Sequence, residues 1–130
     1  MQFSPVLFAC IGLGGALGAM ARYGVTSFMG ATFGTGFPWG TLTVNIAGSF
    51  LIGLLIEIGA LKWSFGPEMR AFMITGFLGA FTTFSTFSLD FATLYDRGNL
   101  ALAAIYVAVS VGLGIIGFFG AMILARGVFQ

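Results

Sequence analysis

Long apolar runs, bounded by isolated charged residues, dominate the sequence. No charged side chain occurs in residues 1–21, 23–56, 71–89 or 98–125. A membrane-spanning helix needs about 20 predominantly apolar residues, so runs of this length indicate membrane spans. Glycine and proline cluster at residues 34–40 (GTGFPWG), a composition typical of a turn, and divide the second run. The pattern predicts four helices, at about residues 4–28, 39–60, 68–94 and 99–126.

Composition supports placing these helices in a membrane. Of the 130 residues, 58% are hydrophobic and only 7% are charged, whereas a soluble domain carries about 25% charged residues. The first segment is rich in glycine and has no basic leading stretch, so we expect a permanent span and not a cleaved signal peptide. We therefore expect an all-α integral membrane protein in which residues 1–130 form a single four-helix transmembrane domain.

The same residues argue against an enzyme and against nucleotide binding. The chain has no histidine and no pair of carboxylates at mid-membrane depth for acid–base chemistry. GLGIIG at residues 112–117 matches the G-x-G-x-x-G fingerprint, but that motif needs a preceding strand. Because this stretch lies inside an uninterrupted apolar helix, we interpret its glycines as packing residues.

The basic residues are almost balanced between the two ends of the predicted bundle. With four spans, one end holds Lys62, Arg70 and Arg126, and the other holds Arg97, with Arg22 if the first helix lets it reach. A three-to-one or three-to-two count gives only a weak positive-inside bias. The sequence therefore predicts insertion in both orientations, which would allow two copies to pair as an antiparallel, dual-topology homodimer.

Small residues recur at helical spacing, beginning with Gly14 and Gly18 in the first helix. The sequence contains 21 glycines, more than its loops require. Small residues four apart let helix backbones approach closely inside a membrane, where no hydrophobic force drives the helices together. We interpret these glycines as sites of tight helix packing.

A few polar residues lie inside the spans. Asn45 stands between Val44 and Ile46, and a bare amide in hydrocarbon costs several kcal/mol unless it is hydrogen-bonded. Tyr106 and Ser110 are four residues apart and share one helix face. The simplest interpretation is an interhelical hydrogen bond, an interfacial tyrosine and a serine bonded to its own backbone. Taken together, they are hydrogen-bond donors without negative charge, as an anion path would need.

The charged residues nearest to the spans allow two interpretations. Arg22 precedes Tyr23, so it is either an interfacial anchor whose charge extends to the head groups or a fixed positive charge that attracts anions to a vestibule. Glu57 and Asp90 lie toward helix ends, where we expect them to reach the interface and be solvated.

The third predicted helix contains the least ordinary stretch, TGFLGAFTTFSTFSLD at residues 75–90. Gly76 and Gly79 precede its hydroxyl residues, and glycine tolerates backbone that leaves the helix, so we expect this helix to be broken near its middle. Carbonyls freed by such a break would suit a hard cation such as sodium. Beyond it, Phe84 and Phe87 form a stripe that is either aromatic packing or a set of electropositive ring edges lining an anion path.

Three segments of the sequence resemble signature segments of the Fluc/CrcB fluoride channels. They are GGALGAMARY, GTLTVNIAGSFLIG and GFLGAFTTFSTFS, at residues 14–23, 40–53 and 76–88. The resemblance implies a fluoride-selective channel that exports cytoplasmic fluoride passively and so gives fluoride tolerance. It further implies a multi-pass protein of the plasma membrane (bacterial inner membrane) that forms an antiparallel homodimer with two pores.

The resemblance also assigns roles to single residues. It implies a fluoride pore formed by the donors and aromatic residues Asn45, Phe84, Phe87, Ser85, Thr86, Tyr106 and Ser110. It implies Arg22 as the basic vestibule residue, and a structural Na+ at the dimer interface held by the backbone carbonyls of Gly79 and Thr82. Phe81 is left as a packing residue. Ala80 and Gly114 depart from the residues that many members carry at these positions.

Two other functions are weighed against the channel. A four-span, dual-topology exporter of small molecules would depend on a carboxylate in the first helix, and this first helix has none. A non-transporting membrane assembly subunit would need only glycine packing, whereas Asn45 and the hydroxyl residues of the third helix are more polar than packing requires.

Overall fold

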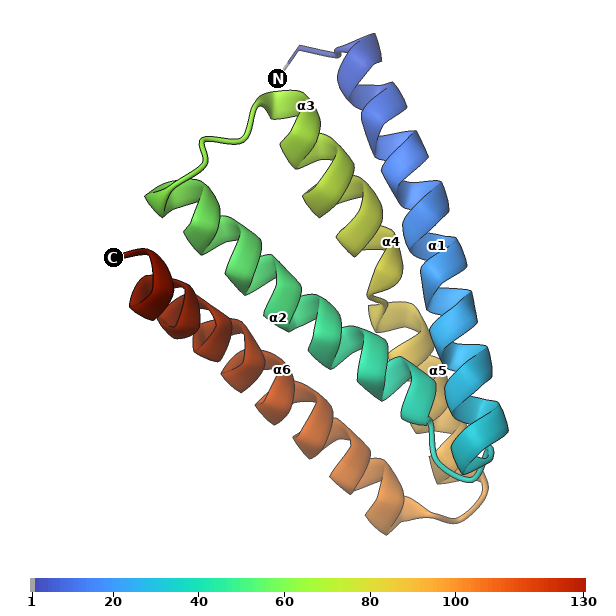
Figure 1. The fold of residues 1–130 in the computed structure, drawn as a ribbon. Coiled ribbons are helices and arrows are strands. Elements are labelled where there is room, and N and C mark those ends of the chain that lie inside the picture. Colours follow the sequence, from blue (N-terminus) through green and yellow to red (C-terminus); the bar gives the residue numbers. More distant parts are fainter. Residues whose placement is uncertain (1) are drawn as a thin grey trace.

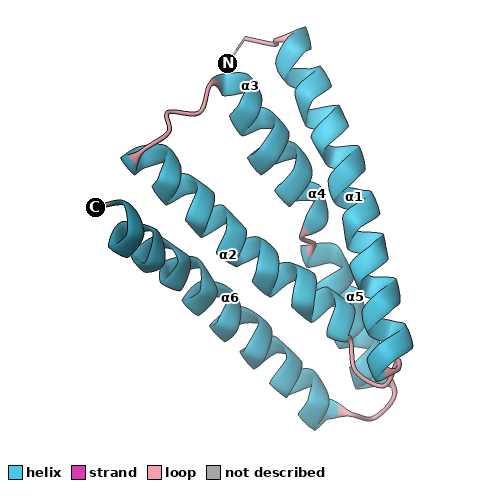
Figure 2. Ribbon diagram, viewed as in Figure 1, coloured by secondary structure: helices cyan, strands magenta, loops and turns pink. Residues whose placement is uncertain are grey.

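The computed structural model describes residues 2–130, which form helices joined by short loops (Figure 1, Figure 2). Four helical stretches are long and apolar enough to cross a membrane, which confirms the expected all-α architecture. They are α1 (Pro5–Phe33), α2 (Trp39–Leu61), a third stretch from Pro67 to Asp96, and α6 (Leu100–Phe129).

Local signals explain where α1 begins and ends. The Ser4 side chain accepts a hydrogen bond from the Leu7 amide at 3.4 Å, and Pro5 occupies the first turn, where its missing N–H costs nothing. The helix continues to Phe33, beyond the end expected near residue 28. It stops at Gly34, whose φ of 81° lies in the left-handed region that favours glycine.

The third stretch is composed of four segments. It begins as α3 (Pro67–Arg70), continues as the π-helical segment η1 (Ala71–Leu78), and ends in α4 (Gly79–Phe81) and α5 (Phe84–Asp96). The π-helical segment was not expected from the sequence. It widens the helix where α1 packs against it, and π-helical turns often occur near functional sites.

Between α4 and α5 the backbone is extended at two threonines. Thr82 has φ −86° and ψ 159°, and Thr83 has φ −156° and ψ 122°. Gly79, where the sequence suggested that the backbone leaves the helix, has helical angles of −61° and −35°. The extended residues are therefore the threonines and not the glycines, because the backbone of Thr83 is bonded to another helix.

The helices pair in two groups, α2 with α6 and α1 with η1, and these are the most extensive contacts in the bundle. Figure 1 shows both termini and the loop before α3 at one end of the bundle. The loops that join α1 to α2 and α5 to α6 lie at the other end. We call these the terminal end and the loop end.

Some of the glycines make the closest helix contacts, as the sequence indicated, whereas Gly112 and Gly120 of α6 have nothing within 4 Å of an added Cβ and are not packing sites within this chain. A Cβ atom on Gly14 would collide with the backbone of Phe72, and one on Gly18 would collide with the backbone of Phe77. Gly53 of α2 meets the Phe118 carbonyl of α6 in the same way. Backbones this close leave no room for any side chain, so these contacts set how near the helices lie.

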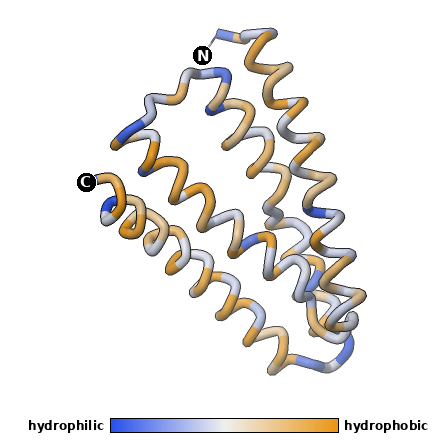
Figure 3. Tube along the Cα trace, viewed as in Figure 1, coloured by the Kyte–Doolittle hydropathy of each residue, from blue (hydrophilic) through white to orange (hydrophobic). Residues whose placement is uncertain are grey.

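The buried interior is small, as expected when lipid surrounds the helices. One cluster contains Leu42, Leu94, Ala103 and Tyr106, and a second contains Val44, Leu78 and Phe81. Phe81 is thus a packing residue. Most other large apolar side chains are exposed, and Figure 3 shows apolar positions along the long helices, with hydrophilic positions at the loops and a few inside α1 and α2.

Glu57 does not reach solvent, contrary to the expectation for its place near a helix end. It is 7% exposed, because α2 packs closely against α6 at this level. Its carboxylate accepts hydrogen bonds from Arg126, from Nε at 2.7 Å and from Nη2 at 3.3 Å. The ion pair compensates the buried charge and joins the terminal ends of α2 and α6.

Candidate functional site

Asn45 holds the extended backbone between α4 and α5. Its Nδ2 donates a hydrogen bond to the Thr83 carbonyl at 2.9 Å, and its Oδ1 accepts one from the Thr83 amide at 2.7 Å. An amide side chain can thus replace both helical bonds of one residue, and the two bonds together fix which way the amide points. One of the two Nδ2 hydrogens is not used in this pair.

The threonine hydroxyls complete the junction. Thr83 Oγ1 accepts a hydrogen bond from the Thr86 amide at 3.1 Å and so caps the first turn of α5. Thr82 Oγ1 donates to the Leu78 carbonyl at 2.9 Å. Ser85 is exposed and Thr86 is half-buried, on the first turn of α5.

These bonds leave two backbone carbonyls without their helical donors. In a regular helix the Gly79 carbonyl would accept from the Thr83 amide, and the Thr82 carbonyl would accept from the Thr86 amide. Here the Thr83 amide donates to Asn45, and the Thr86 amide donates to the Thr83 hydroxyl. The junction therefore offers carbonyl oxygens whose usual partners are engaged elsewhere, a donor set that suits a hard cation.

Phe84 and Phe87 stand together at the start of α5. Their ring centroids are 5.7 Å apart, with the rings tilted by 37°. Phe84 is 79% exposed, whereas Phe87 packs on Tyr106 with 5.1 Å between centroids. The aromatic stripe thus runs from the surface of this chain into its core.

Tyr106 is fully buried, and its hydroxyl donates to Asp90 Oδ2 at 3.0 Å. This contact corrects the expectation that Asp90 is simply solvated, because α5 carries the carboxylate to a position beside α6. The Tyr106 hydroxyl, expected to face an ion, is here engaged with a carboxylate. Its oxygen can still accept a further bond, but its one hydrogen is in use.

Ser110 lies one turn beyond Tyr106 and differs from it in one respect. Its Oγ is buried and makes no hydrogen bond to any residue among 2–130. The expected bond to its own helix backbone is therefore wrong for this serine. Leaving a buried hydroxyl without a partner costs about 1–3 kcal/mol. A ligand that accepted its hydrogen would therefore remove this cost.

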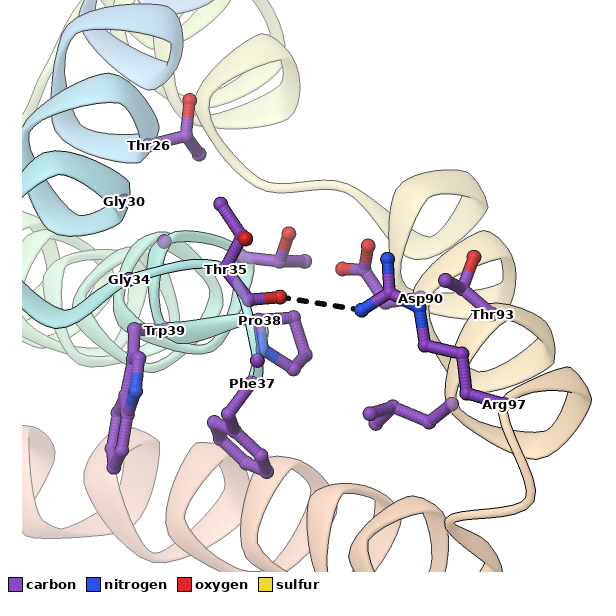
Figure 4. A pocket seen from close by; sticks show the side chains of 14 residues that line it. Thr26, Gly30, Gly34, Thr35, Phe37, Pro38, Trp39, Asp90, Thr93 and Arg97 are labelled. Carbon is purple, nitrogen blue, oxygen red and sulfur yellow. Dashed lines mark hydrogen bonds between the residues drawn. The ribbon is translucent and has the colours of Figure 1, made fainter.

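A cavity of about 260 Å³ opens at the loop end, beyond Asp90 (Figure 4). Its wall includes the hydroxyl residues Thr26, Thr35, Thr41 and Thr93, together with Asp90, Arg97 and the glycine-rich 34–38 loop. Arg97 Nη1 donates to the Thr35 carbonyl at 3.5 Å, which brings its guanidinium over the cavity.

Arg22 lies apart from these groups. It is half-buried on α1, and within residues 2–130 it forms no ion pair and no side-chain hydrogen bond to Asn45, Thr83 or α6. Its backbone carbonyl accepts the Thr26 hydroxyl at 2.9 Å. The structure thus joins Asn45 to Thr83 and brings Phe84, Phe87 and Tyr106 into one aromatic row, and it gives Arg22 no ion pair within residues 2–130.

Three features of this region were missed by sequence reasoning. The role of Thr83 was detectable, because a hydroxyl residue immediately before a new helical run is an N-cap signal. Asp90 was also detectable, since it follows Phe87 by three residues on one helix face. The cavity at the loop end was not, because its wall combines α1, α2 and α5, which only the fold brings together.

Comparisons with known proteins place these residues in a family. Residues 9–122 match the family described as "CrcB-like protein, Camphor Resistance (CrcB)". A protein of Rhodospirillum centenum is 48% identical over 92% of this chain and 95% of its own length. One of Agrobacterium fabrum is 48% identical over 93% and 97%, and one of Cereibacter sphaeroides is 50% identical over 90% and 92%. Each is named "Fluoride-specific ion channel FluC". With a family match over most of its residues and relatives of this similarity, the chain belongs to the CrcB-like family.

Proposed function

We propose that this chain forms a fluoride-selective ion channel, a multi-pass protein of a bacterial inner membrane that lets cytoplasmic fluoride leave passively. The names of its relatives support the ion, and the helix composition supports the location. The observation that carries the proposal is the buried Ser110 hydroxyl without a partner. It is an unused hydrogen-bond donor inside a helix bundle, where a polar group without a partner lowers the stability of the fold.

The unused donors of the proposed pore suit fluoride for a physical reason. Fluoride is small and holds its water tightly, so a pore must replace that water with close donors. Ser110 contributes an unused hydroxyl, and Asn45 retains one amide hydrogen after bonding Thr83. Neutral donors replace part of the hydration shell without a full positive charge, and an ion must also be able to leave its sites for conduction to occur.

The aromatic side chains define the rest of the path. The edge of a phenyl ring is electropositive, so Phe84 and Phe87 can present ring edges to an anion. Ser85 and Thr86 flank them on the first turn of α5, and Tyr106 packs against Phe87. A narrow passage between ring edges disfavours the larger chloride.

One chain by itself leaves this path open on one side, because Phe84 is 79% exposed. We therefore propose an antiparallel, dual-topology homodimer in which the partner completes each of two pores. The near-balance of basic residues between the two ends supports insertion in both orientations. Arg22, which has no ion-pair partner among residues 2–130, is proposed as the vestibule charge that attracts the ion.

The same proposal includes a structural Na+ at the dimer interface. It also includes a break in the third helix, between α4 and α5, that frees carbonyls for this ion. The Gly79 and Thr82 carbonyls would hold the ion, since the donors that a helix would give them are bonded to Asn45 and Thr83. Replacing sodium by a bulky organic cation during purification is expected to lower the dimer fraction, measured by cross-linking. An unchanged dimer fraction would remove sodium from the proposal.

Flux from liposomes tests the central proposal. Purified protein in vesicles with a potassium gradient clamped by an ionophore should release fluoride rapidly, measured with a fluoride electrode, and release chloride negligibly. Fluoride release no faster than from protein-free vesicles would overturn the channel.

Two aromatic variants test the path. Phe84→Ile and Phe87→Ile remove the ring edges but keep apolar bulk, so each is expected to reduce fluoride flux while the dimer persists. Phe119→Ile is the matched control, because Phe119 is an exposed phenylalanine of α6 outside the proposed path. Normal flux through both α5 variants would show that ring edges do not line the path.

A further inference from the structure

A groove at the terminal end of the bundle arises from the way α1 and the third stretch diverge. Near mid-length the two are held backbone to backbone, where a Cβ on Gly76 would lie 2.7 Å from the Ile11 carbonyl. Toward the terminal end they separate (Figure 1). The space between them is a groove of about 540 Å³, lined by Leu7, Ile11, Phe65, Pro67, Arg70, Ala71, Ile74 and Thr75.

The walls of this groove are mostly apolar, and its charge lies at one end. Leu7 and Ile11 come from α1, and Ile74 comes from η1. Phe65 closes the groove from the loop, and it is anchored there because its ring lies against Gly59 of α2, 3.0 Å from the position of a Cβ on that glycine. The groove therefore suits an apolar ligand, because most of its lining is apolar.

Arg70 is the charged member of the groove. It stands in α3, the first turn of the third stretch, and so at the level where lipid head groups begin. Arg70 is exposed and forms no ion pair within residues 2–130. Glu68 is two residues away and therefore does not face it across the helix. The arginine is free to bind an anion.

A groove among transmembrane helices does not stay empty. Water is excluded from the part of the groove that lies below the head groups, and an unfilled space there loses the dispersion contacts of its walls. The available apolar material is an acyl chain, and a planar guanidinium binds phosphate through two parallel hydrogen bonds. The apolar walls and the arginine thus both indicate a phospholipid, which carries an acyl chain and a phosphate.

We propose that this groove binds an anionic phospholipid, with one acyl chain between α1 and η1 and the head-group phosphate on Arg70. The lipid would fill the space that the divergence of the two helices opens and so support their contact at the glycines. The proposal is independent of the ion that the protein conducts, because none of the residues proposed for the fluoride pore lines the groove.

Native mass spectrometry of the purified full-length protein, mixed with phosphatidylglycerol or phosphatidylcholine, tests this site. Wild type should retain phosphatidylglycerol preferentially, and Arg70→Gln should reduce that retention about fivefold, because one basic residue near an anionic head group contributes about 1 kcal/mol. Lys62→Gln is the matched control, since Lys62 is an exposed cation at the same end outside the groove. Equal retention of both lipids by wild type, or an unchanged preference in Arg70→Gln, would overturn the proposal.

A second variant tests the apolar part of the groove. Ile11→Phe should fill the space and release the lipid, whereas Ile123→Phe, at an exposed position of α6, should not. Inorganic phosphate alone should fail to compete, because it has no acyl chain. If wild type retains no lipid and Ile11→Phe lowers the dimer fraction, a second copy of the chain fills the groove and the lipid site is refuted. Fluoride flux, measured in parallel, separates this outcome from a failure of the channel proposal.

Discussion

Two regions of this bundle, the α1–η1 contact and the region where α2, α5 and α6 meet, are stabilised differently. Between α1 and η1 the contact is backbone against backbone, made by Gly14, Gly18 and Gly76, and it contains no hydrogen-bonded polar side chain. Where α2 meets α5 and α6, polar side chains make hydrogen bonds between elements: Asn45 of α2 bonds to the backbone of Thr83, and Tyr106 of α6 bonds to Asp90 of α5. The first region thus depends on the absence of side chains, whereas the second adds hydrogen-bonded polar side chains to the glycine contact of Gly53 with Phe118.

The difference shows where function can be located in a membrane protein of this size. A glycine contact satisfies its own backbone inside each helix and leaves nothing for a ligand. A buried polar group needs a hydrogen-bonding partner, and the Ser110 hydroxyl has none among residues 2–130. We infer that the α1–η1 side is scaffold and that the α2–α5–α6 side is the ion path.

The largest effect is expected from Asn45→Leu. The change leaves the amide and the carbonyl of Thr83 without partners, at about 1–3 kcal/mol for each. Thermal unfolding in detergent should show strong destabilisation, and fluoride flux should be lost. Thr43→Val is the control, because the Thr43 hydroxyl bonds only to its own helix at Trp39. Wild-type stability in Asn45→Leu would mean that the junction does not depend on this amide.

Gly18→Ala should have the next largest effect, and it tests the scaffold side. The added methyl group collides with the backbone of Phe77, so α1 and η1 must separate, at a cost of about 1–3 kcal/mol. Gly12→Ala, on the same helix with nothing within 4 Å of the new methyl group, should be neutral or slightly stabilising. Equal melting temperatures for the two variants would contradict the close contact.

Ser110→Ala should separate stability from function. Because the hydroxyl has no partner among residues 2–130, its removal should leave the melting temperature unchanged or raise it slightly. Flux should fall roughly tenfold or more, since a hydrogen bond to a charged group contributes about 1.5–3 kcal/mol. The control is Thr32→Ala, which removes an exposed hydroxyl bonded to Phe28 of its own helix. Unaltered flux in Ser110→Ala would exclude this serine from the path.

The smallest effect is expected from Arg22→Gln. A vestibule charge raises the local concentration of anions without binding them tightly, so flux should fall only about two- to threefold. The loss should disappear at high ionic strength, where the field of the charge is screened within a few ångströms. A loss that salt does not change would indicate a direct contact with the ion instead.

Much of the architecture could be predicted from local pattern. Uncharged runs near 20 residues predicted four apolar helices, and glycines four apart predicted close packing, since both depend on residues adjacent in sequence or on one helix face. The break was expected from Gly79 to Thr82, with the glycines allowing it, whereas the extended residues are Thr82 and Thr83 and Gly79 is helical. Glycine only permits a departure from the helix, whereas a bond to Asn45, 38 residues away, requires one.

By itself, the sequence determined that the helices span a membrane, about where they lie, and which kinds of hydrogen-bond donor they carry. Hydropathy and side-chain chemistry are local properties, so they can be read without the fold. Tertiary structure decided which donors are already in use. It placed Asp90 against Tyr106, and it diverted the amides of Thr83 and Thr86 from two backbone carbonyls. It also left the Ser110 hydroxyl without a hydrogen-bond partner among residues 2–130. Whether a polar group is satisfied depends on what lies across from it in space, and that is set only when the helices pack.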